Sequence, residues 1–117
     1  MVIDEVIRAH VAWRAKLSSY LRKRDGTLKA SEIEVDGRCE LGRWIAGEGT
    51  AHAASPEFGA VRVLHARFHR CAADVVRKAD ADKDVSEEVV LGGSSAYGMV
   101  STDLVGALRS MRARLGQ

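Results

Sequence analysis

Three segments of the sequence repeat apolar or aromatic residues in alternating steps of three and four, the spacing that places side chains on one face of a helix. Such faces are buried by packing against one another, so the sequence predicts an all-α fold, a four-helix-type bundle with three long helices plus short helices. Turn signals such as Asp25-Gly26, and the helix start at Ser55-Pro56, mark the helix ends. The predicted long helices cover residues 3–24, 56–79 and 96–114, a short helix covers 39–46, and residues 27–37 and 80–86 connect them.

Length, composition and charge limit the other classes. With 117 residues, of which 46% are hydrophobic and 29% charged, the chain is expected to form a single domain over 1–117. Its 18 basic and 16 acidic residues are scattered, which argues against nucleic acid as a partner because phosphate binding needs concentrated positive charge. No apolar run reaches the roughly 20 residues of a membrane span, and the first ten residues lack the pattern of a signal peptide. We expect a cytoplasmic domain that makes no membrane contact.

Histidine occupies core positions in two of the three stripes. His10 falls in the first stripe where an apolar residue is expected, and His65 does so in the second, with His69 four residues further along the same side of the helix. A buried imidazole without partners costs about 1–3 kcal/mol, and three of them can satisfy one another by binding one metal ion. Each could instead find a carboxylate or a backbone carbonyl. The pattern indicates a metal site and leaves that alternative open.

A structural zinc site takes four tetrahedral nitrogen or sulfur ligands, and the remaining candidates for the fourth are Cys39, His52 and Cys71. Cys71 points about 140° away from the mean direction of the two histidines on its helix, so it is interpreted as a packing residue. His52 lies in a Gly/Ala-rich loop and is expected to be solvated. Cys39 begins the short helix beside a glycine turn, from which a thiolate could reach the histidines.

Three ordered motifs also carry a resemblance to a known family. The first is His10 followed three residues on by Trp13, the second is Cys39-Glu40-Leu41-Gly42-Arg43-Trp44, and the third is His65-Ala66-Arg67-Phe68-His69. Together they closely resemble the chemoreceptor zinc-binding domain (CZB) family, and the resemblance extends from the first motif into the last predicted helix. It implies a Zn2+ ion held by His10, Cys39, His65 and His69. The residues that carry over as packing around the site are Trp13, Leu41, Gly42, Trp44 and Phe68.

The same resemblance implies a function. Members of this family are bacterial regulatory domains, commonly homodimers, attached to chemoreceptors or diguanylate cyclases. We therefore expect the chain to control chemotaxis or cyclic-di-GMP signalling through an output domain in cis or in trans. The family is associated with sensing of zinc and of oxidants such as hypochlorous acid. As a zinc-bound thiolate, Cys39 would be the most oxidisable residue of the chain and the redox-sensing group.

Three alternatives compete with this interpretation. Catalysis needs an open coordination position, which four protein ligands close, so the chain is not expected to be an enzyme. A di-iron site needs several inward-facing carboxylates, and the predicted stripes contain none. In the third alternative, zinc is a structural staple of a dimerisation module with no sensing role. That module would keep its zinc under mild oxidants.

Overall fold

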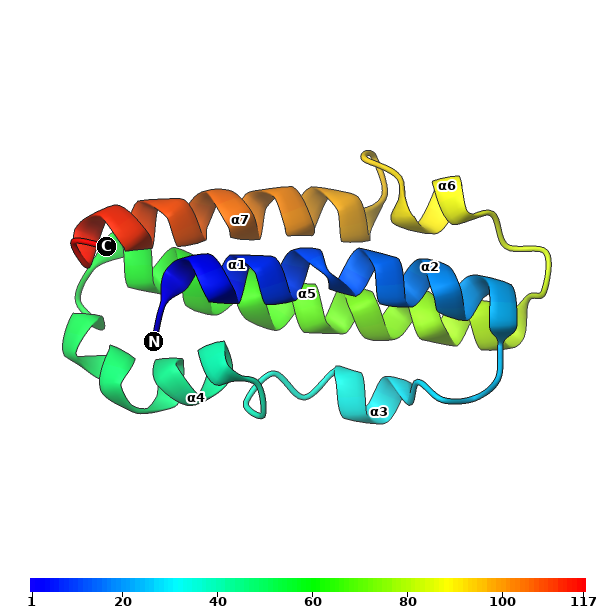
Figure 1. Ribbon diagram of the computed structural model, residues 1–117, viewed down its shortest axis with the longest axis horizontal. Helices are drawn as coiled ribbons and strands as arrows, with labels where there is room; N and C mark the ends of the chain where they lie inside the picture. Colours follow the sequence, from blue (N-terminus) through cyan, green and yellow to red (C-terminus); the bar gives the residue numbers. More distant parts are fainter.

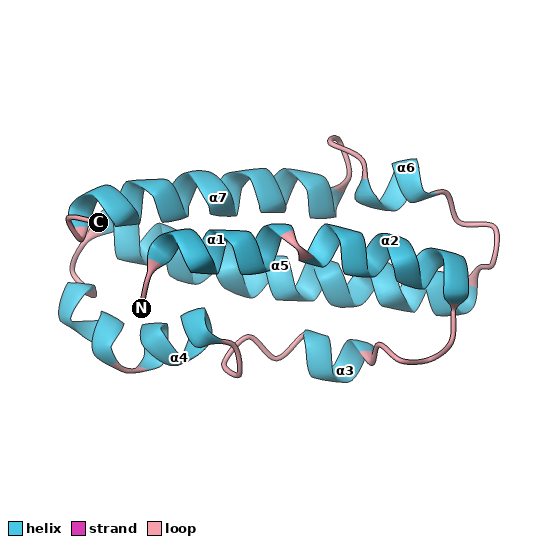
Figure 2. Ribbon diagram, viewed as in Figure 1, coloured by secondary structure: helices cyan, strands magenta, loops and turns pink.

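Three long rods of helix run side by side through the computed structural model, which describes all 117 residues (Figure 1). The first rod is α1 (Ile3–Val11) followed end to end by α2 (Trp13–Lys23), the second is α5 (Pro56–Ala81), and the third is α7 (Ala96–Arg114). Every regular element is a helix (Figure 2), which confirms the predicted all-α fold. The contact between α5 and α7 is the most extensive in the bundle.

The fourth layer of the bundle is the segment that returns from the end of α2 to the start of α5. It contains α3 (Ala30–Ile33), α4 (Glu40–Ala46) and the 3-10 helix η1 (Glu48–His52), and it follows the lower edge of the molecule in Figure 1. A further short helix, α6 (Glu87–Leu91), precedes α7. The result is an elongated bundle of 44 × 24 × 20 Å with three long helices plus short ones, as predicted.

The apolar stripes of the three rods meet in one continuous core. Burying a side chain of the size of leucine or valine stabilises the fold by about 1.5–3 kcal/mol, so this core accounts for the association of the rods. No helix combines the length and the apolar character needed to cross a lipid bilayer. The fully enclosed aliphatic side chains are Ile3, Leu17, Leu41, Val61, Val76, Leu91, Leu104 and Leu108.

The structure differs from the predicted elements in four places. The first helix is interrupted at Ala12. Two residues earlier, the ring of His10 donates to the carbonyl of Val6, and a side chain that enters the backbone hydrogen bonds of a helix is a known cause of such irregularity. The connection predicted over 27–37 contains the one-turn helix α3, which is too short to show a stripe. The segment after α4, where the sequence predicted a Gly/Ala-rich loop, forms η1, and α5 continues to Ala81 instead of ending at residue 79.

Serine side chains cap both long helices of the second half of the chain. Before α5, the hydroxyl of Ser55 accepts the N–H of Phe58 at 3.1 Å, which confirms the helix start predicted there. Before α7, the hydroxyl of Ser95 donates to the carbonyl of Gly92 at 2.6 Å and accepts the N–H of Gly98 at 2.9 Å. Each cap satisfies an amide of the first helical turn that has no partner within the helix.

Candidate metal centre

His65 and His69 lie on the side of α5 that faces the core. Their spacing of four residues brings the ring centroids to 4.6 Å, and both side chains are buried. The Nδ1–H of His69 donates to the carbonyl of Ile33 at 2.8 Å, which leaves its Nε2 atom free to act as a ligand. Two imidazoles on one helix thus point into the same small space.

His10 reaches the same space from α1. Its ring centroid lies 5.2 Å from that of His65 and 5.9 Å from that of His69. Its Nδ1–H donates to the carbonyl of Val6 at 2.9 Å, so the Nε2 atom is again the free one. His10 therefore meets the histidine pair because it occupies a core position in the first stripe.

Cys39 supplies the only sulfur of the group, and it does so from the N-cap position of α4. Its Sγ atom accepts the N–H of Gly42 at 3.4 Å. The same atom lies 3.2 Å from Nε2 of His65 and 3.8 Å from Nε2 of His69. Ligand atoms of the four residues His10, Cys39, His65 and His69, called the His3Cys cluster from here on, all lie within 4.8 Å of one another.

Gly42 allows the backbone to bring Cys39 to this point. A Cβ atom at position 42 would lie 1.8 Å from the carbonyl oxygen of Asp36, so only glycine permits the turn at Asp36-Gly37 to pack against α4. The sequence suggested Gly42 as a packing residue near the site. The structure gives the specific reason, which is a close approach between two stretches of backbone.

The donor set fits a zinc ion. Three nitrogens and one sulfur are ligands that zinc prefers, and bonds of about 2.0–2.3 Å in a tetrahedron place the donors about 3.3–3.7 Å apart. The two sulfur-to-nitrogen distances of 3.2 and 3.8 Å bracket that value. Two of the three histidines already have their outer nitrogen bound to a carbonyl, the arrangement that fixes a metal-binding imidazole in the correct tautomer. Zn2+ is therefore the cofactor that this donor set supports.

Burial favours the neutral form of two of the three imidazoles, those of His65 and His10. Desolvation lowers the pKa of His65 to about 3, and the neighbouring His69 and His10 act in the same direction. Desolvation also lowers the pKa of His10, and it raises the pKa of the Cys39 thiol. Metal binding requires neutral imidazoles and a thiolate. His65 and His10 therefore meet the first requirement without the metal, while the metal must displace the proton from Cys39.

Among the residues expected to pack around the site, Phe68 and Gly42 contact its ligands. Phe68 is almost fully buried, and its ring centroid lies 5.2 Å from that of His10. Leu41 is buried in α4 next to Gly42. Trp44 lies further along α4, where its ring stacks on His52 at 6.0 Å.

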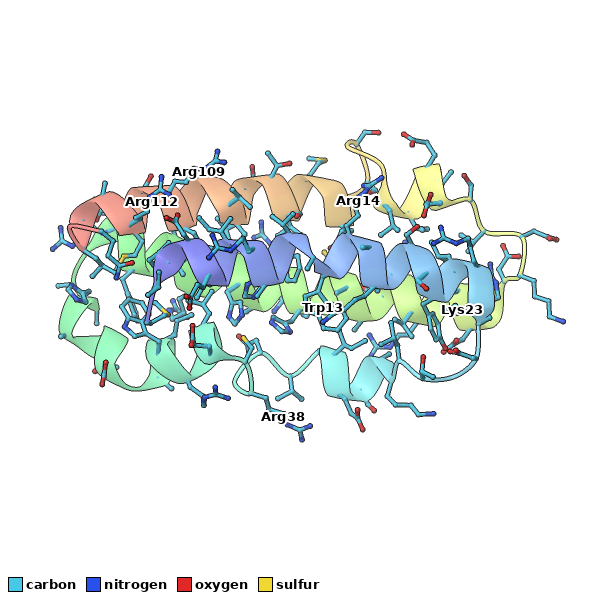
Figure 3. All side chains as sticks on the ribbon, in the orientation of Figure 1. Trp13, Arg14, Lys23, Arg38, Arg109 and Arg112 are labelled. Atoms are coloured by element: carbon cyan, nitrogen blue, oxygen red, sulfur yellow. The ribbon has the colours of Figure 1, made fainter.

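An open groove of about 380 Å3 reaches the His3Cys cluster from the solvent. Cys39, His69 and Trp13 all line it. In Figure 3, Trp13 lies on the side of α2 that faces the 27–39 segment, and Arg38 extends outward from that segment. The groove thus places Cys39 and His69 beside the solvent. The remaining lining residues are Thr27, Leu28, Lys29, Glu32, Ile33, Val35 and Arg38.

The other two candidate ligands lie away from the cluster. His52 is half-buried in η1 against Trp44, and Cys71 lies on another side of α5, where it lines two hollows beside Ala96 of α7. The sequence did not reveal Asp36, whose carboxylate lies 3.8 Å from Nδ1 of His65. Only the turn signal Asp36-Gly37 marked this residue, and nothing in the sequence relates it to a position 29 residues later.

Comparison with protein families gives one match. The model of the family described as "Chemoreceptor zinc-binding domain" matches residues 10–76, a span that includes the whole His3Cys cluster. Comparisons with curated proteins and with solved structures give no match.

Proposed function

The chain belongs to the chemoreceptor zinc-binding domain family, and on that premise we propose that its His3Cys cluster holds one zinc ion and acts as a regulatory sensor. The observation that carries the proposal is the convergence of four ligand atoms from three separate elements, α1, α4 and α5. Four protein ligands fill a tetrahedral zinc site, so the zinc has no open position for a substrate and the domain is not an enzyme. The bound ion would join the short-helix layer to two of the long rods.

Cys39 is the group through which sensing would operate. Without metal its pKa is raised by burial, so it is a poor nucleophile, whereas a zinc-bound cysteine is a thiolate at neutral pH. Hypochlorous acid oxidises a thiolate to a sulfenic acid and releases chloride, and a sulfenic acid is a weaker zinc ligand. The groove that Cys39 helps to line would supply the route for such a small oxidant.

The output of the sensor would come from movement of α4. Cys39 lies at the start of α4, and the zinc ion would link it to the histidines of α1 and α5. Loss of zinc or oxidation of the sulfur would therefore loosen the packing of the short-helix layer on these two helices. We propose that this change alters a homodimer interface and is passed to a chemoreceptor or diguanylate cyclase domain, in cis or in trans, in the bacterial cytoplasm.

Zinc release under oxidant tests this function. The purified chain is expected to carry one zinc per chain and to release it when stoichiometric hypochlorous acid is added, as measured with a chromophoric zinc indicator. Cys71→Ser is the matched control, because it removes the other thiol and should leave the release unchanged. Zinc that stays bound after oxidation of Cys39 would instead identify a structural staple, and absence of zinc would contradict the proposal as a whole.

A further inference from the structure

The three imidazoles of the His3Cys cluster differ in how their outer nitrogens are held. Those of His10 and His69 donate to backbone carbonyls at 2.9 and 2.8 Å. The Nδ1 atom of His65 has no hydrogen-bond partner, although the side chain is fully buried. A carboxylate oxygen of Asp36 lies 3.8 Å away. His65 is thus the one histidine whose outer nitrogen still lacks a partner.

Asp36 is fixed in place by the same turn that places the sulfur ligand. Its backbone carbonyl accepts from the Cys39 thiol at 3.7 Å and packs directly on Gly42. The carboxylate is 44% exposed and takes part in no other ion pair, so it is free to move the short distance to His65. One residue therefore contacts the sulfur ligand through its backbone and approaches a nitrogen ligand through its side chain.

We propose that Asp36 is a positioning residue of the zinc site, whose carboxylate accepts the Nδ1–H of His65 when Nε2 of that ring faces the metal. A neutral imidazole that offers Nε2 as a ligand must carry its proton on Nδ1, and a buried donor without an acceptor is costly. A carboxylate acceptor holds the ring in the required tautomer and raises its strength as a ligand. This inference rests on the proposed zinc function.

A consequence is that the sulfur and one nitrogen ligand are coupled through a single turn. Displacement of Cys39 moves Asp36 as well, because only three peptide units join the two residues and because the carbonyl of Asp36 packs on Gly42, whose N–H donates to the sulfur. His65 then loses its acceptor at the same time as the metal loses its sulfur. Displacement of Cys39 would therefore weaken zinc binding by more than the loss of the sulfur ligand alone.

Zinc affinity of the full chain, measured by competition with a chromophoric chelator, tests the role of Asp36. Asp36→Ala is expected to weaken zinc binding by roughly 10- to 100-fold, the cost typical of losing an outer partner of a zinc ligand. Asp36→Asn keeps the shape and an uncharged acceptor, so its affinity should fall between those of Asp36→Ala and the native chain. Glu34→Gln is the matched control, because Glu34 lies on the same segment but pairs with Arg77. It should bind zinc as the native chain does.

A spectroscopic measurement separates positioning from a general loss of structure. In the zinc-loaded native chain, long-range 1H–15N spectra should show a strongly deshielded Nδ1–H on His65. In Asp36→Ala that proton should shift upfield while those of His10 and His69 stay in place. Native affinity in both Asp36 variants, or an unchanged His65 signal, would overturn the inference while leaving the zinc site intact. A native chain that binds no zinc would overturn the proposed function itself and this inference with it.

Discussion

The start of α4 and the start of α7 have the same local structure. In each, the N-cap side chain donates to the carbonyl three residues before it and accepts the N–H of a glycine three residues after it. Ser95 makes these bonds at 2.6 and 2.9 Å, and Cys39 makes them at 3.7 and 3.4 Å. In each, a Cβ on that glycine would lie about 2 Å from the same carbonyl, at 1.8 Å for Gly42 and 2.1 Å for Gly98.

The difference between these two starts is the atom at the cap. The hydroxyl oxygen of Ser95 is a strong acceptor, and its role is to cap α7. Sulfur is a weak acceptor with longer contacts, and it is placed 3.2 Å from Nε2 of His65. The metal site thus uses a common helix-start geometry, in which a zinc ligand, Cys39, occupies the N-cap position that serine occupies at the start of α7.

Replacement of the capping atom should give the largest effect. Cys39→Ser keeps a cap and removes the sulfur ligand, so zinc affinity should fall by more than the roughly 100-fold that loss of an outer partner costs. Cys39→Ala should lose zinc equally and also lose about 1 kcal/mol of metal-free stability, because no cap remains. Chelator competition and urea unfolding in the presence of a chelator measure the two quantities. Equal zinc affinity in Cys39→Ser and the native chain would show that the sulfur at the start of α4 is not a zinc ligand.

Replacement of the two glycines should destabilise both helix starts. Gly42→Ala and Gly98→Ala each force a methyl group onto a backbone carbonyl, and each should lower the free energy of unfolding by about 3 kcal/mol. Only Gly42→Ala should also weaken zinc binding. Gly59→Ala is the matched control, because it lies in α5 with no atom near its Cβ position, and it should be neutral or slightly stabilising. Urea unfolding decides the matter, and a silent Gly42→Ala would contradict the close approach described here.

Removal of zinc should change the amide exchange rates at the two helix starts by different amounts. With free zinc at 100 times its dissociation constant, openings that expel the metal should become about 100-fold rarer. The N–H of Gly42 should therefore exchange about 100-fold faster once zinc is removed, if local opening of α4 controls its exchange. The N–H of Gly98 should change less. Hydrogen exchange followed by NMR gives both rates in one sample, and equal changes at the two amides would show that zinc acts on the whole fold and not on α4.

Loss of the oxygen cap should give the smallest effect. Ser95→Ala should cost about 1 kcal/mol of stability, because the N–H of Gly98 loses its acceptor. Zinc affinity should stay at the native value, since Ser95 belongs to no part of the His3Cys cluster. Thermal unfolding with and without zinc checks both statements. A fall in zinc affinity would show that the two helix starts are coupled.

The parts of this structure that the sequence could predict are those that repeat with helical period. The stripes predicted the three rods, and the phase of His10 and His65 within them predicted core positions. The start of α5 followed from its serine and proline. These features depend on spacing along one helix, which a sequence states directly.

The parts that the sequence could not predict depend on backbone atoms meeting across the chain. The carbonyl of Ile33 holds His69 from 36 residues away, and side-chain identity carries no information about that carbonyl. The approach of Asp36 to His65 arises only after the turn at Asp36-Gly37 has packed on Gly42. The sequence placed Cys39 at the start of the short helix, but cysteine is not among the residues that favour the N-cap position, so no capping rule indicates the bond from the N–H of Gly42 to its sulfur.

X-ray absorption at the zinc edge reports the atoms bound to the metal, so it tests the His3Cys site directly. For one zinc per native chain, we predict three nitrogen neighbours at about 2.0–2.1 Å and one sulfur neighbour at about 2.3 Å. The sulfur signal should disappear in any zinc-loaded Cys39→Ser protein and persist in Cys71→Ser. A zinc spectrum of the native chain without sulfur, or with two sulfurs, would contradict the His3Cys site.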